Sequence, residues 1–342
     1  MSGGDDRPAS GDGGAPRRAT IADVARTAGV STATVSRVLS GTARVSPAKD
    51  AQVRAAIEAL DYNPSDLTRA IFSGRANSVG VLVSDMRNPY YVDLMRGVES
   101  VLTTAGTLAF LASGARDAER ERRILRSMDS QRVRGLVATV TGRHEAIIRT
   151  MADRGTECVF MTRPVTVQHR RVHSVRVDDH AVGALAWRRL RDGLRRDIVV
   201  VTQSSTQYTQ RSRLQGFRDA AAADGVELPD DHVVEVGSLD QPTARLAELL
   251  RRRRVDGVFA VTGIASLRTY QQVAALGIAV PDDLAFVGFD DFPWAPYIAT
   301  PLTLIAQPAL AMGTRAAELI LEEPGRSQEI VMAPYLVERA SG

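Results

Sequence analysis

The sequence predicts an α/β protein in which a small all-α module with a helix-turn-helix arrangement precedes two lobes built on doubly wound parallel sheets. Three observations lead to this prediction. Residues 19–62 carry short helical patterns that begin at Ser or Thr. From residue 77 onward, apolar strand segments alternate with amphipathic helices, and a second series of such segments begins near residue 198. Strands that are apolar throughout and joined by helices belong to parallel sheets covered on both faces, so two rounds indicate two lobes.

The composition and the N-terminal segment narrow the class of protein. The 342 residues exceed one ordinary domain. Residues 1–16 are rich in Gly, Asp, Ser and Pro without a hydrophobic core, so we expect residues 1–18 to be a disordered tail and not a secretory signal. No apolar stretch approaches the ~20 residues that cross a membrane. The single cysteine, Cys158, lies in an apolar run and is expected to be a buried thiol. A cytoplasmic protein is therefore expected.

The net charge of +3 is unevenly distributed along the chain. Residues 17–75 hold nine basic and five acidic side chains, whereas residues 1–16 hold one basic and three acidic ones. Positive charge is thus concentrated near the N-terminal module, where a surface that binds phosphates needs it.

The N-terminal module reads as three short helices. Residues 20–23, Thr-Ile-Ala-Asp, match a capping box that begins the first helix, and Gly29 supplies the left-handed residue that ends it. Ser31 caps a second helix, which ends at Gly41, and Ser46-Pro47 opens a third. Two short helices joined by a tight turn with one glycine are a helix-turn-helix arrangement.

The second helix is expected to face DNA, because a recognition helix presents its N-terminal residues to base edges in the major groove. Arg37 can read guanine through two hydrogen bonds, and Thr32 and Ala33 can touch thymine methyls or purine edges. Four hydroxyl side chains suit phosphate contacts, which position DNA without specifying its sequence: Thr20, Ser31, Thr34 and Ser36. Taken alone, the same pattern also fits a plain three-helix bundle with a polar surface.

The longer region predicts its strands and helices from continuous apolar runs and from helical periodicity. In the first round, strands are expected at residues 79–83, 108–111, 135–138 and 158–161, with helices at 90–105 and 118–130. In the second round, strands are expected at residues 198–201, 233–236, 257–261 and 285–289, with a helix at 211–224.

Residues 20–41 resemble the DNA-binding headpiece of the LacI/GalR family of bacterial repressors, and the likeness continues through Val45-Ser46 and residues 61–64, Asp-Tyr-Asn-Pro. It spans about residues 19–340. The resemblance implies a helix-turn-helix headpiece joined to a two-lobed, periplasmic-binding-protein-like sensor of doubly wound parallel sheets.

The resemblance also implies domain bounds: a headpiece at 19–62, a hinge helix or linker at 63–75, and an effector-binding and dimerisation domain at 76–342. The chain is expected to cross between lobes near residues 178, 307 and 323. The first lobe would then hold 76–178 and 308–322, and the second lobe 179–307 and 323–342.

The hinge segment follows Asn63-Pro64 and resembles a helix that orders on the operator and pushes an apolar side chain into the minor groove. Ile71 falls at this wedge position, where the family usually has Leu. Such a wedge unstacks a base step and bends the duplex. The alternative is a plain linker that happens to contain an isoleucine.

Five residues match positions that contact the effector in the family: Tyr90, Tyr91, Asp178, Arg213 and Asp290. The tyrosines suit stacking on a sugar or base ring, the arginine suits hydroxyl or carboxylate groups, and the aspartates suit ligand hydroxyls. Each can instead be a structural ion pair or turn residue. Two departures from the family, Thr162-Arg163-Pro164 and Thr262-Gly263, remove usual acceptors for sugar hydroxyls. The departures leave several alternatives open: a less hydroxylated effector, a phosphorylated one, an effector that makes fewer contacts, or no effector at all.

These observations together predict a transcriptional regulator, expected to be a repressor, that binds a pseudopalindromic double-stranded DNA operator as a homodimer. A small molecule, expected to be a sugar or sugar derivative, would control its affinity as inducer or corepressor. No enzyme motif, metal site, cofactor or membrane contact is expected. The alternative is a solute-binding protein or an enzyme on the same two-lobed scaffold, which the headpiece opposes.

Overall fold

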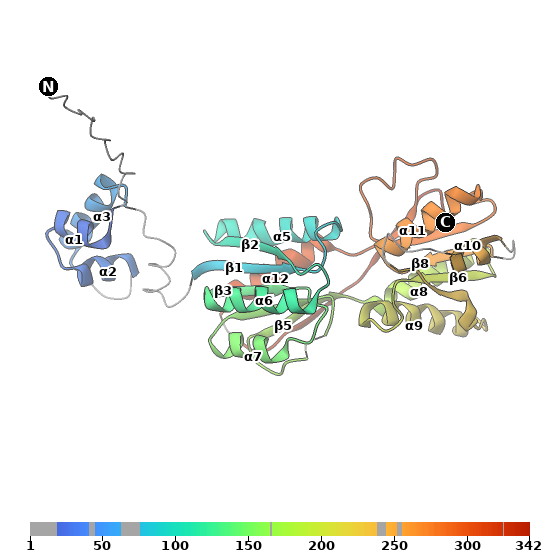
Figure 1. The fold of residues 1–342 in the computed structure, drawn as a ribbon, viewed down its shortest axis with the longest axis horizontal. Helices are drawn as coiled ribbons and strands as arrows, with labels where there is room; N and C mark the ends of the chain where they lie inside the picture. Colours follow the sequence, from blue (N-terminus) through green and yellow to red (C-terminus); the bar gives the residue numbers. More distant parts are fainter. Residues whose placement is uncertain are drawn as a thin grey trace, which may run out of the picture. The chain divides into compact units, whose positions relative to one another are not determined.

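The computed structural model describes residues 19–40, 45–62, 76–164, 166–237, 244–251, 255–323 and 325–342. The chain divides into two compact units, Met1–Asn77 and Ser78–Gly342 (Figure 1). The wedge residue that the sequence predicts, Ile71, and most of the expected hinge lie outside the described residues.

The described part of the first unit contains three helices: α1 (Ile21–Thr27), α2 (Thr32–Ser40) and α3 (Pro47–Ala59). Their apolar faces meet at Val24, Val35 and Val53, which are fully buried. The predicted helix end is confirmed, since Gly29 has φ of +65°. Ser46 precedes α3 without making a side-chain capping bond, so the start of that helix relies on Pro47.

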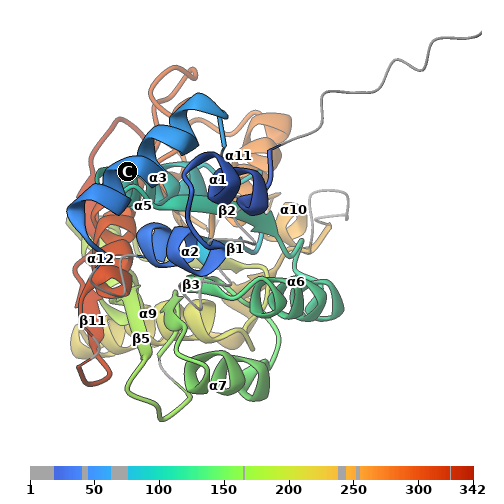
Figure 2. The same cartoon turned by 90° about the vertical axis from the view of Figure 1, so that its left-hand side faces the viewer.

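The first lobe of the second unit is a six-stranded sheet in the order β11-β5-β4-β3-β1-β2. Its strands are β1 (Ala76–Val83), β2 (Leu108–Ser113), β3 (Val133–Ala138), β4 (Glu157–Met161), β5 (Val172–Val177) and β11 (Glu329–Met332). One face packs against α5 (Tyr90–Thr104) and α12 (Ala309–Leu321), and the other against α6 (Ala118–Ser130) and α7 (Glu145–Asp153) (Figure 2).

The second lobe repeats this plan with the strand order β12-β10-β9-β8-β6-β7. Its strands are β6 (Ile198–Thr202), β7 (Val233–Glu235), β8 (Gly257–Ala260), β9 (Ala285–Phe289), β10 (Thr303–Ala306) and β12 (Tyr335–Val337). Its helices are α8 (Asp179–Asp192), α9 (Tyr208–Ala223), α10 (Ala244–Arg251) and α11 (Gly263–Leu276), with a short 3₁₀ turn at Asp230–His232. The first two helices cover one face and the other two cover the opposite face.

The strand pairs whose register the structure describes are parallel in both lobes, apart from the antiparallel pair of β10 and β12. This confirms the doubly wound architecture. Among the described residues, no helix is both long and apolar enough to cross a membrane.

The third crossing between lobes differs from the prediction. The sequence places residues 323–342 in the second lobe, but β11 pairs in parallel with β5 of the first lobe. Ile330 and Met332 pack against the core of that lobe, which stabilises the additional edge strand. The chain therefore crosses after Met332, and the first lobe includes residues 325–332.

Each lobe also contains one pair of helices in very close contact. On α5 and α12, a Cβ on Gly97 would lie 2.1 Å from the carbonyl oxygen of Leu310, and one on Gly313 would lie 2.0 Å from that of Leu94. Gly183 on α8 and Gly216 on α9 allow an equivalent approach in the second lobe. Glycine at these positions lets the helix backbones touch and brings the starts of α5 and α9 to the cavity described below.

Candidate functional site

The first helix of the N-terminal unit begins with a complete capping box. The amide of Asp23 donates to Oγ1 of Thr20 at 3.3 Å, and the amide and hydroxyl of Thr20 both donate to Oδ2 of Asp23. The hydrogen bonds from Thr20 lower the pKa of Asp23 to about 2. The prediction of a capping box is confirmed, and the Thr20 hydroxyl proton is already used within the protein.

Ser31 directly precedes the second helix and accepts hydrogen bonds from its first turn. Its Oγ accepts from the amide of Thr34 at 3.2 Å and lies 3.0 Å from Oγ1 of Thr34, while its carbonyl accepts from the amide of Val35. These bonds hold the first turn of α2 in place after the tight turn at Gly29.

The side chains predicted to read bases lie on one exposed side of α2. Thr32, Ala33 and Arg37 are exposed, whereas Val35 is fully buried in the core of the unit. Thr34 and Ser36, predicted to contact phosphates, are half-buried at the edge of this surface. The first turns of α2 thus present a small polar surface of the kind that enters a major groove.

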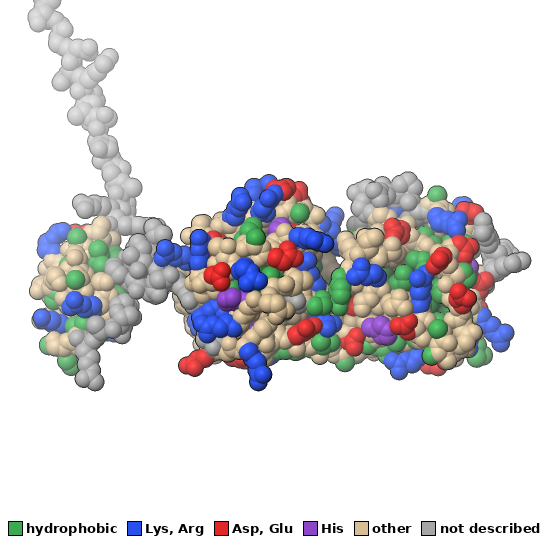
Figure 3. All heavy atoms as spheres, turned by 90° about the horizontal axis from the view of Figure 1, so that it is seen from below, with side chains coloured by type: hydrophobic (Ala, Val, Ile, Leu, Met, Phe, Trp, Pro, Cys, Tyr) green, Lys and Arg blue, Asp and Glu red, His purple; other side chains and the backbone are tan. Residues whose placement is uncertain are grey.

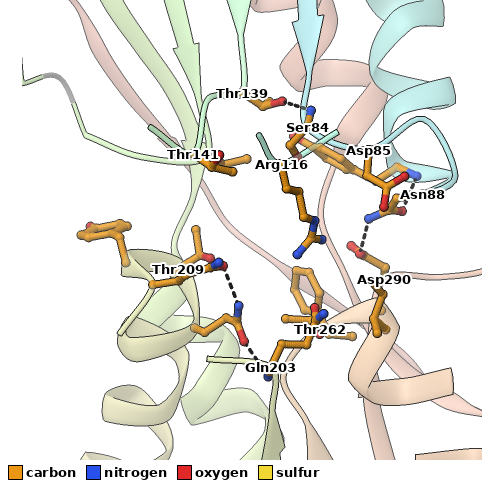
Figure 4. Close-up of a pocket in the computed structure, with 18 of the residues that line it drawn as sticks. Ser84, Asp85, Asn88, Arg116, Thr139, Thr141, Gln203, Thr209, Thr262 and Asp290 are labelled. Carbon is orange, nitrogen blue, oxygen red and sulfur yellow. Dashed lines mark hydrogen bonds between the residues drawn. The ribbon is translucent and has the colours of Figure 1, made fainter. Parts of the chain in front are cut away.

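The second unit contains a cavity of about 580 Å³ that residues of both lobes line (Figure 4). Several lining residues directly follow parallel strands: Asp85 after β1, Thr139 after β3, Thr262 after β8 and Asp290 after β9. The cavity therefore lies at the carboxyl ends of both sheets, where open α/β sheets bind their ligands.

Two tyrosines from the start of α5 form an aromatic wall of the cavity. The rings of Tyr90 and Tyr91 meet edge to face, with centroids 5.0 Å apart. The hydroxyl of Tyr91 lies 2.5 Å from Oγ of Ser84. The buried hydroxyl of Tyr90 has no hydrogen-bond partner among the described residues, and burial raises its pKa well above the usual value. A buried hydroxyl without a partner is costly, so a ligand that supplies one gains affinity.

Arg213 on α9 lines the cavity but is also held by the protein. Its Nε donates to Oδ1 of Asp179 at 2.8 Å, and its Nη1 donates to the carbonyl of Val261 at 2.8 Å. Its guanidinium carbon lies 3.6 Å from the centroid of the Phe289 ring. The predicted effector arginine thus has a structural role at the floor of the cavity.

Asp290 connects the two lobes across the cavity. Its Oδ2 accepts from Nδ2 of Asn88 in the first lobe at 3.1 Å, and its Oδ1 accepts from Nε2 of Gln307 at 2.9 Å (Figure 4). The residue has φ of +65°, and burial raises the pKa of its carboxyl. A strained backbone and a buried carboxylate at the junction of two lobes are typical of a functional position.

Asp178 differs from the other predicted effector residues, because it is absent from the residues that line the cavity. Its side chain accepts from the amide of Ala181 at 3.0 Å and caps α8. The next residue, Asp179, is the carboxylate that meets Arg213. A helix cap at the crossover explains why an aspartate stands at position 178.

The sequence prediction missed several cavity residues that carry charge. Arg116 follows β2 with φ of +58°, and its side chain extends from the first lobe into the space near Thr141, Thr262 and Asp290 (Figure 4). Arg143 and Arg211 also line the cavity. Arg116 comes shortly after a strand, as Asp85 does. Ligands bind at the carboxyl ends of parallel strands, so this rule was sufficient to find Arg116.

A buried carboxylate organises the loop that carries Arg143. Glu121 on α6 is fully buried and accepts from the amides of Thr141 and Gly142, and its Oε2 lies 2.9 Å from Nε2 of His144. Burial alone would raise the pKa of Glu121, but these hydrogen bonds together lower it. One ionised side chain therefore fixes the backbone of residues 141–144 at the rim of the cavity.

The two units thus define a class of protein: a helix-turn-helix module followed by a two-lobed domain with a ligand cavity between the lobes. Comparison with known proteins agrees with both parts. The family of bacterial regulatory proteins, lacI family, matches residues 20–65, and the periplasmic binding protein-like domain matches residues 174–342.

Individual relatives match nearly the whole chain. The HTH-type transcriptional regulator CelR of Thermobifida fusca is 32% identical over 338 residues, covering 95% of this chain and 99% of the relative. The ribose operon repressor of Escherichia coli K12 is 31% identical, covering 94% and 99%. A solved structure of a CelR–cellobiose complex has 31% identity and a TM-score of 0.70, covering 95% of this chain and all of the other. The chain belongs to the LacI family and is a helix-turn-helix transcriptional regulator.

Proposed function

We propose that this regulator binds a pseudopalindromic double-stranded DNA operator as a homodimer, and that a small molecule in the cavity controls its affinity for that operator. The observation that carries the proposal is the cavity at the carboxyl ends of both sheets, bridged by the hydrogen bond between Asn88 and Asp290. We assign residues 19–62 as the headpiece, 63–75 as the hinge and 76–342 as the effector domain.

In this proposal the exposed side of α2 enters the major groove. Arg37, Thr32 and Ala33 read bases, and this role is supported by their exposure on the first turns of the helix. Ser31, Thr34 and Ser36 contact phosphates, and Thr20 contributes through a lone pair of its hydroxyl, whose proton goes to Asp23. Ile71 is assigned as the minor-groove wedge from its position in the sequence.

The effector is proposed to act on the relative arrangement of the two lobes. A ligand that contacts Tyr90 and Tyr91 on one side and Asp290 on the other binds both lobes at once. It therefore favours one relative arrangement of the lobes, and it alters the fraction of protein able to bind the operator. The cellobiose complex of CelR and the ribose operon repressor support a sugar or sugar derivative as the effector class.

The homodimer is supported by apolar side chains on the edge of the first sheet. Leu108, Phe110 and Leu111 on β2 are 58%, 47% and 41% exposed, and Val92 on α5 and Leu310 on α12 are also exposed. An exposed apolar edge strand is a site for association with another chain. Twofold pairing of this surface places two headpieces on one pseudopalindromic operator.

We assign no catalytic role to the cavity. A regulator of its own chromosome acts in the cytoplasm. The alternative is a solute-binding protein or an enzyme on the same scaffold, and it gives the headpiece no function.

A fluorescence-anisotropy titration tests the proposal. The purified protein is titrated at fixed salt against labelled DNA from upstream of its own gene and against a scrambled duplex, with and without pooled sugars and sugar phosphates. We expect tight binding to the native fragment alone, and a shifted curve with one pool. Equal, salt-sensitive binding to both duplexes would contradict a specific regulator of this promoter.

A further inference from the structure

The cavity carries an unusual excess of positive charge. Six arginines and two aspartates line it, and no Lys, Glu or His of the described residues does. The outer surface of the same unit mixes Arg with Asp and Glu on the face that Figure 3 shows, since the single lysine of the chain, Lys49, lies in the first unit. The excess of arginine is therefore a property of the cavity, which is open to solvent on the side where Arg116, Arg143 and Arg211 are exposed, and a cleft lined by one sign of charge attracts a ligand of the opposite sign.

The two aspartates leave little acceptor capacity for a neutral polyol. The carboxylate of Asp85 accepts hydrogen bonds from Nε and Nη2 of Arg87. These bonds lower the pKa of the carboxyl. Asp290 accepts from an amide group on each side. A site that grips several sugar hydroxyls needs buried acceptors, and both carboxylates of this cavity already accept hydrogen bonds from the protein.

Several of the arginines, by contrast, have no carboxylate partner. Arg116, Arg143 and Arg211 make no ion pair with any carboxylate among the described residues, although all three line the cavity. Arg163 donates from Nη2 to the carbonyl of Gly142, but its buried Nε has no partner in the described part of the chain. Burial lowers the pKa of Arg163, and the charges of Glu145 and Glu121 oppose this effect.

The arginines come from both sides of the cavity. Arg116 and Arg143 belong to the first lobe, and Arg211 belongs to the first turn of α9 in the second lobe. This 16-residue helix begins at the cavity without a side-chain cap or an acidic residue in its first turn. Its uncapped amides and its dipole add partial positive charge on the side opposite Arg116.

An independent observation indicates that the cavity awaits a polar ligand. The hydroxyl of Tyr90 is buried, with the residue 7% exposed, and has no partner among the described residues. Tyr90 is also one of the residues that line the same cavity. A ligand oxygen there would complete a buried hydrogen bond that the protein alone leaves unmade.

We propose that the effector is a small polyol that carries an oxyanion, a phosphate or a carboxylate, and that Arg116, Arg143 and Arg211 with the start of α9 bind this group. The inference rests on the proposed function, since it names the chemistry of the effector. It differs from a neutral ligand such as the cellobiose bound by CelR. Closing both lobes on one anion joins the first lobe to the second through charge-assisted hydrogen bonds.

The test compares matched neutral and anionic probes on the full chain. Thermal unfolding and calorimetric titration are run at constant ionic strength with inorganic phosphate, D-glucose 6-phosphate, D-gluconate, D-glucose and cellobiose. The variants are Arg116→Gln and Arg211→Gln. Arg188→Gln is the matched control, because Arg188 is an exposed arginine of α8 outside the cavity.

We expect at least one anionic probe to raise the unfolding midpoint of the wild type while D-glucose does not. Its affinity should fall at least about tenfold in both cavity variants and stay unchanged in the control. The affinities for D-glucose 6-phosphate and D-gluconate are then compared, and the higher one identifies the anionic group as a phosphate or a carboxylate. The proposal is overturned if no anion shifts the wild type, or if a neutral sugar binds wild type and cavity variants equally.

Operator titrations on the same preparations separate the two levels of inference. Specific operator binding that responds to a neutral sugar would leave the proposed function standing and refute the anionic effector. Absence of specific operator binding would refute the proposed function whatever the probes do.

Discussion

Arg213 donates from its Nε to Oδ1 of Asp179 over 2.8 Å, which ties the second turn of α9 to the first residue of α8. Both side chains are almost fully buried, at 7% and 1% exposure. Burial raises the pKa of Asp179, and the charge of Arg213 opposes this effect. The pair therefore stabilises the second lobe at the same place where that lobe forms the floor of the cavity.

Replacing Arg213 with Ala should impair folding as well as the effector response. The change leaves the carboxylate of Asp179 buried without its partner, and such a loss costs about 3–5 kcal/mol. Urea unfolding measures this cost, and operator titration with effector measures the response. The control is Arg218→Ala, since the half-buried Arg218 lies on the same helix in a pair with the exposed Asp230, and the loss of that pair should cost at most about 1 kcal/mol. Equal costs in the two variants would show that the buried pair contributes nothing to stability.

Much of the second unit was predictable because its strands are apolar throughout. The runs at residues 79–83, 198–201 and 285–289 are long enough to indicate parallel strands without reference to a partner. The edge strand β11 was not predictable, since only Ile330 and Met332 of its four residues are both apolar and packed on the core. Short strands of mixed polarity depend on pairing with a neighbour, which a single sequence does not reveal.

The cavity was predictable in part for a similar reason. Tyr90, Tyr91 and Asp290 follow recognisable strands, and the structure places all three at the cavity. Asp178 also sits at a crossover, but it caps a helix instead. Whether a polar side chain at such a position caps a helix or enters a cavity depends on one rotamer, and sequence pattern does not fix rotamers. Arg143 was missed because a buried carboxylate from a distant helix positions its loop.

The contact between α5 and α12 should not tolerate a methyl group. In Gly97→Ala the new Cβ would meet the carbonyl oxygen of Leu310 at 2.1 Å, so the two helix backbones must separate. We expect a loss of about 3 kcal/mol in the free energy of unfolding. Gly193→Ala is the control, because its φ is ordinary and the nearest atom would lie at 3.4 Å. A loss in the control as large as in Gly97→Ala would rule out close helix packing as the cause.

The headpiece should lose stability in a defined acid window. The folded-state pKa of Asp23 is about 2, below its ordinary value of 3.8, so the ionised form is favoured by folding. Its contribution is complete above about pH 4 and is lost as the pH falls towards 2. Amide hydrogen exchange in α1 measures this change. In Thr20→Val the main hydrogen bond to the carboxyl is gone and the folded-state pKa of Asp23 rises, so the loss should be smaller and should be complete at a higher pH. An identical pH profile in that variant would exclude the capping box as the source.

Arg37→Ala should weaken operator binding by about 1–3 kcal/mol and relax discrimination at one base pair, because Arg37 is exposed on the proposed reading side of α2. The measurement is anisotropy against the operator, its single-base variants and random DNA at one salt concentration. Arg188→Ala removes the same charge from the other unit and should change neither affinity nor discrimination. If Arg37→Ala lowers the affinity for operator and for random DNA equally, Arg37 contacts phosphates and does not read a base.

Glu121→Gln should release the loop that carries Arg143. The neutral amide keeps one acceptor oxygen and places an NH2 group where the second oxygen accepted, so the backbone amides of Thr141 and Gly142 no longer both have an acceptor. We expect a loss of about 2–3 kcal/mol in unfolding free energy and faster exchange of the Gly142 amide. Glu119→Gln is the control, since Glu119 lies on the same helix in an exposed pair with Arg122 and should change stability by less than about 0.5 kcal/mol.

A weaker affinity for anionic probes in Glu121→Gln, with unfolding still cooperative, would indicate that the loop presents Arg143 to the ligand. Affinity equal to that of Glu119→Gln would mean that Arg143 binds the anion without help from this buried carboxylate, and the loop would then serve stability alone.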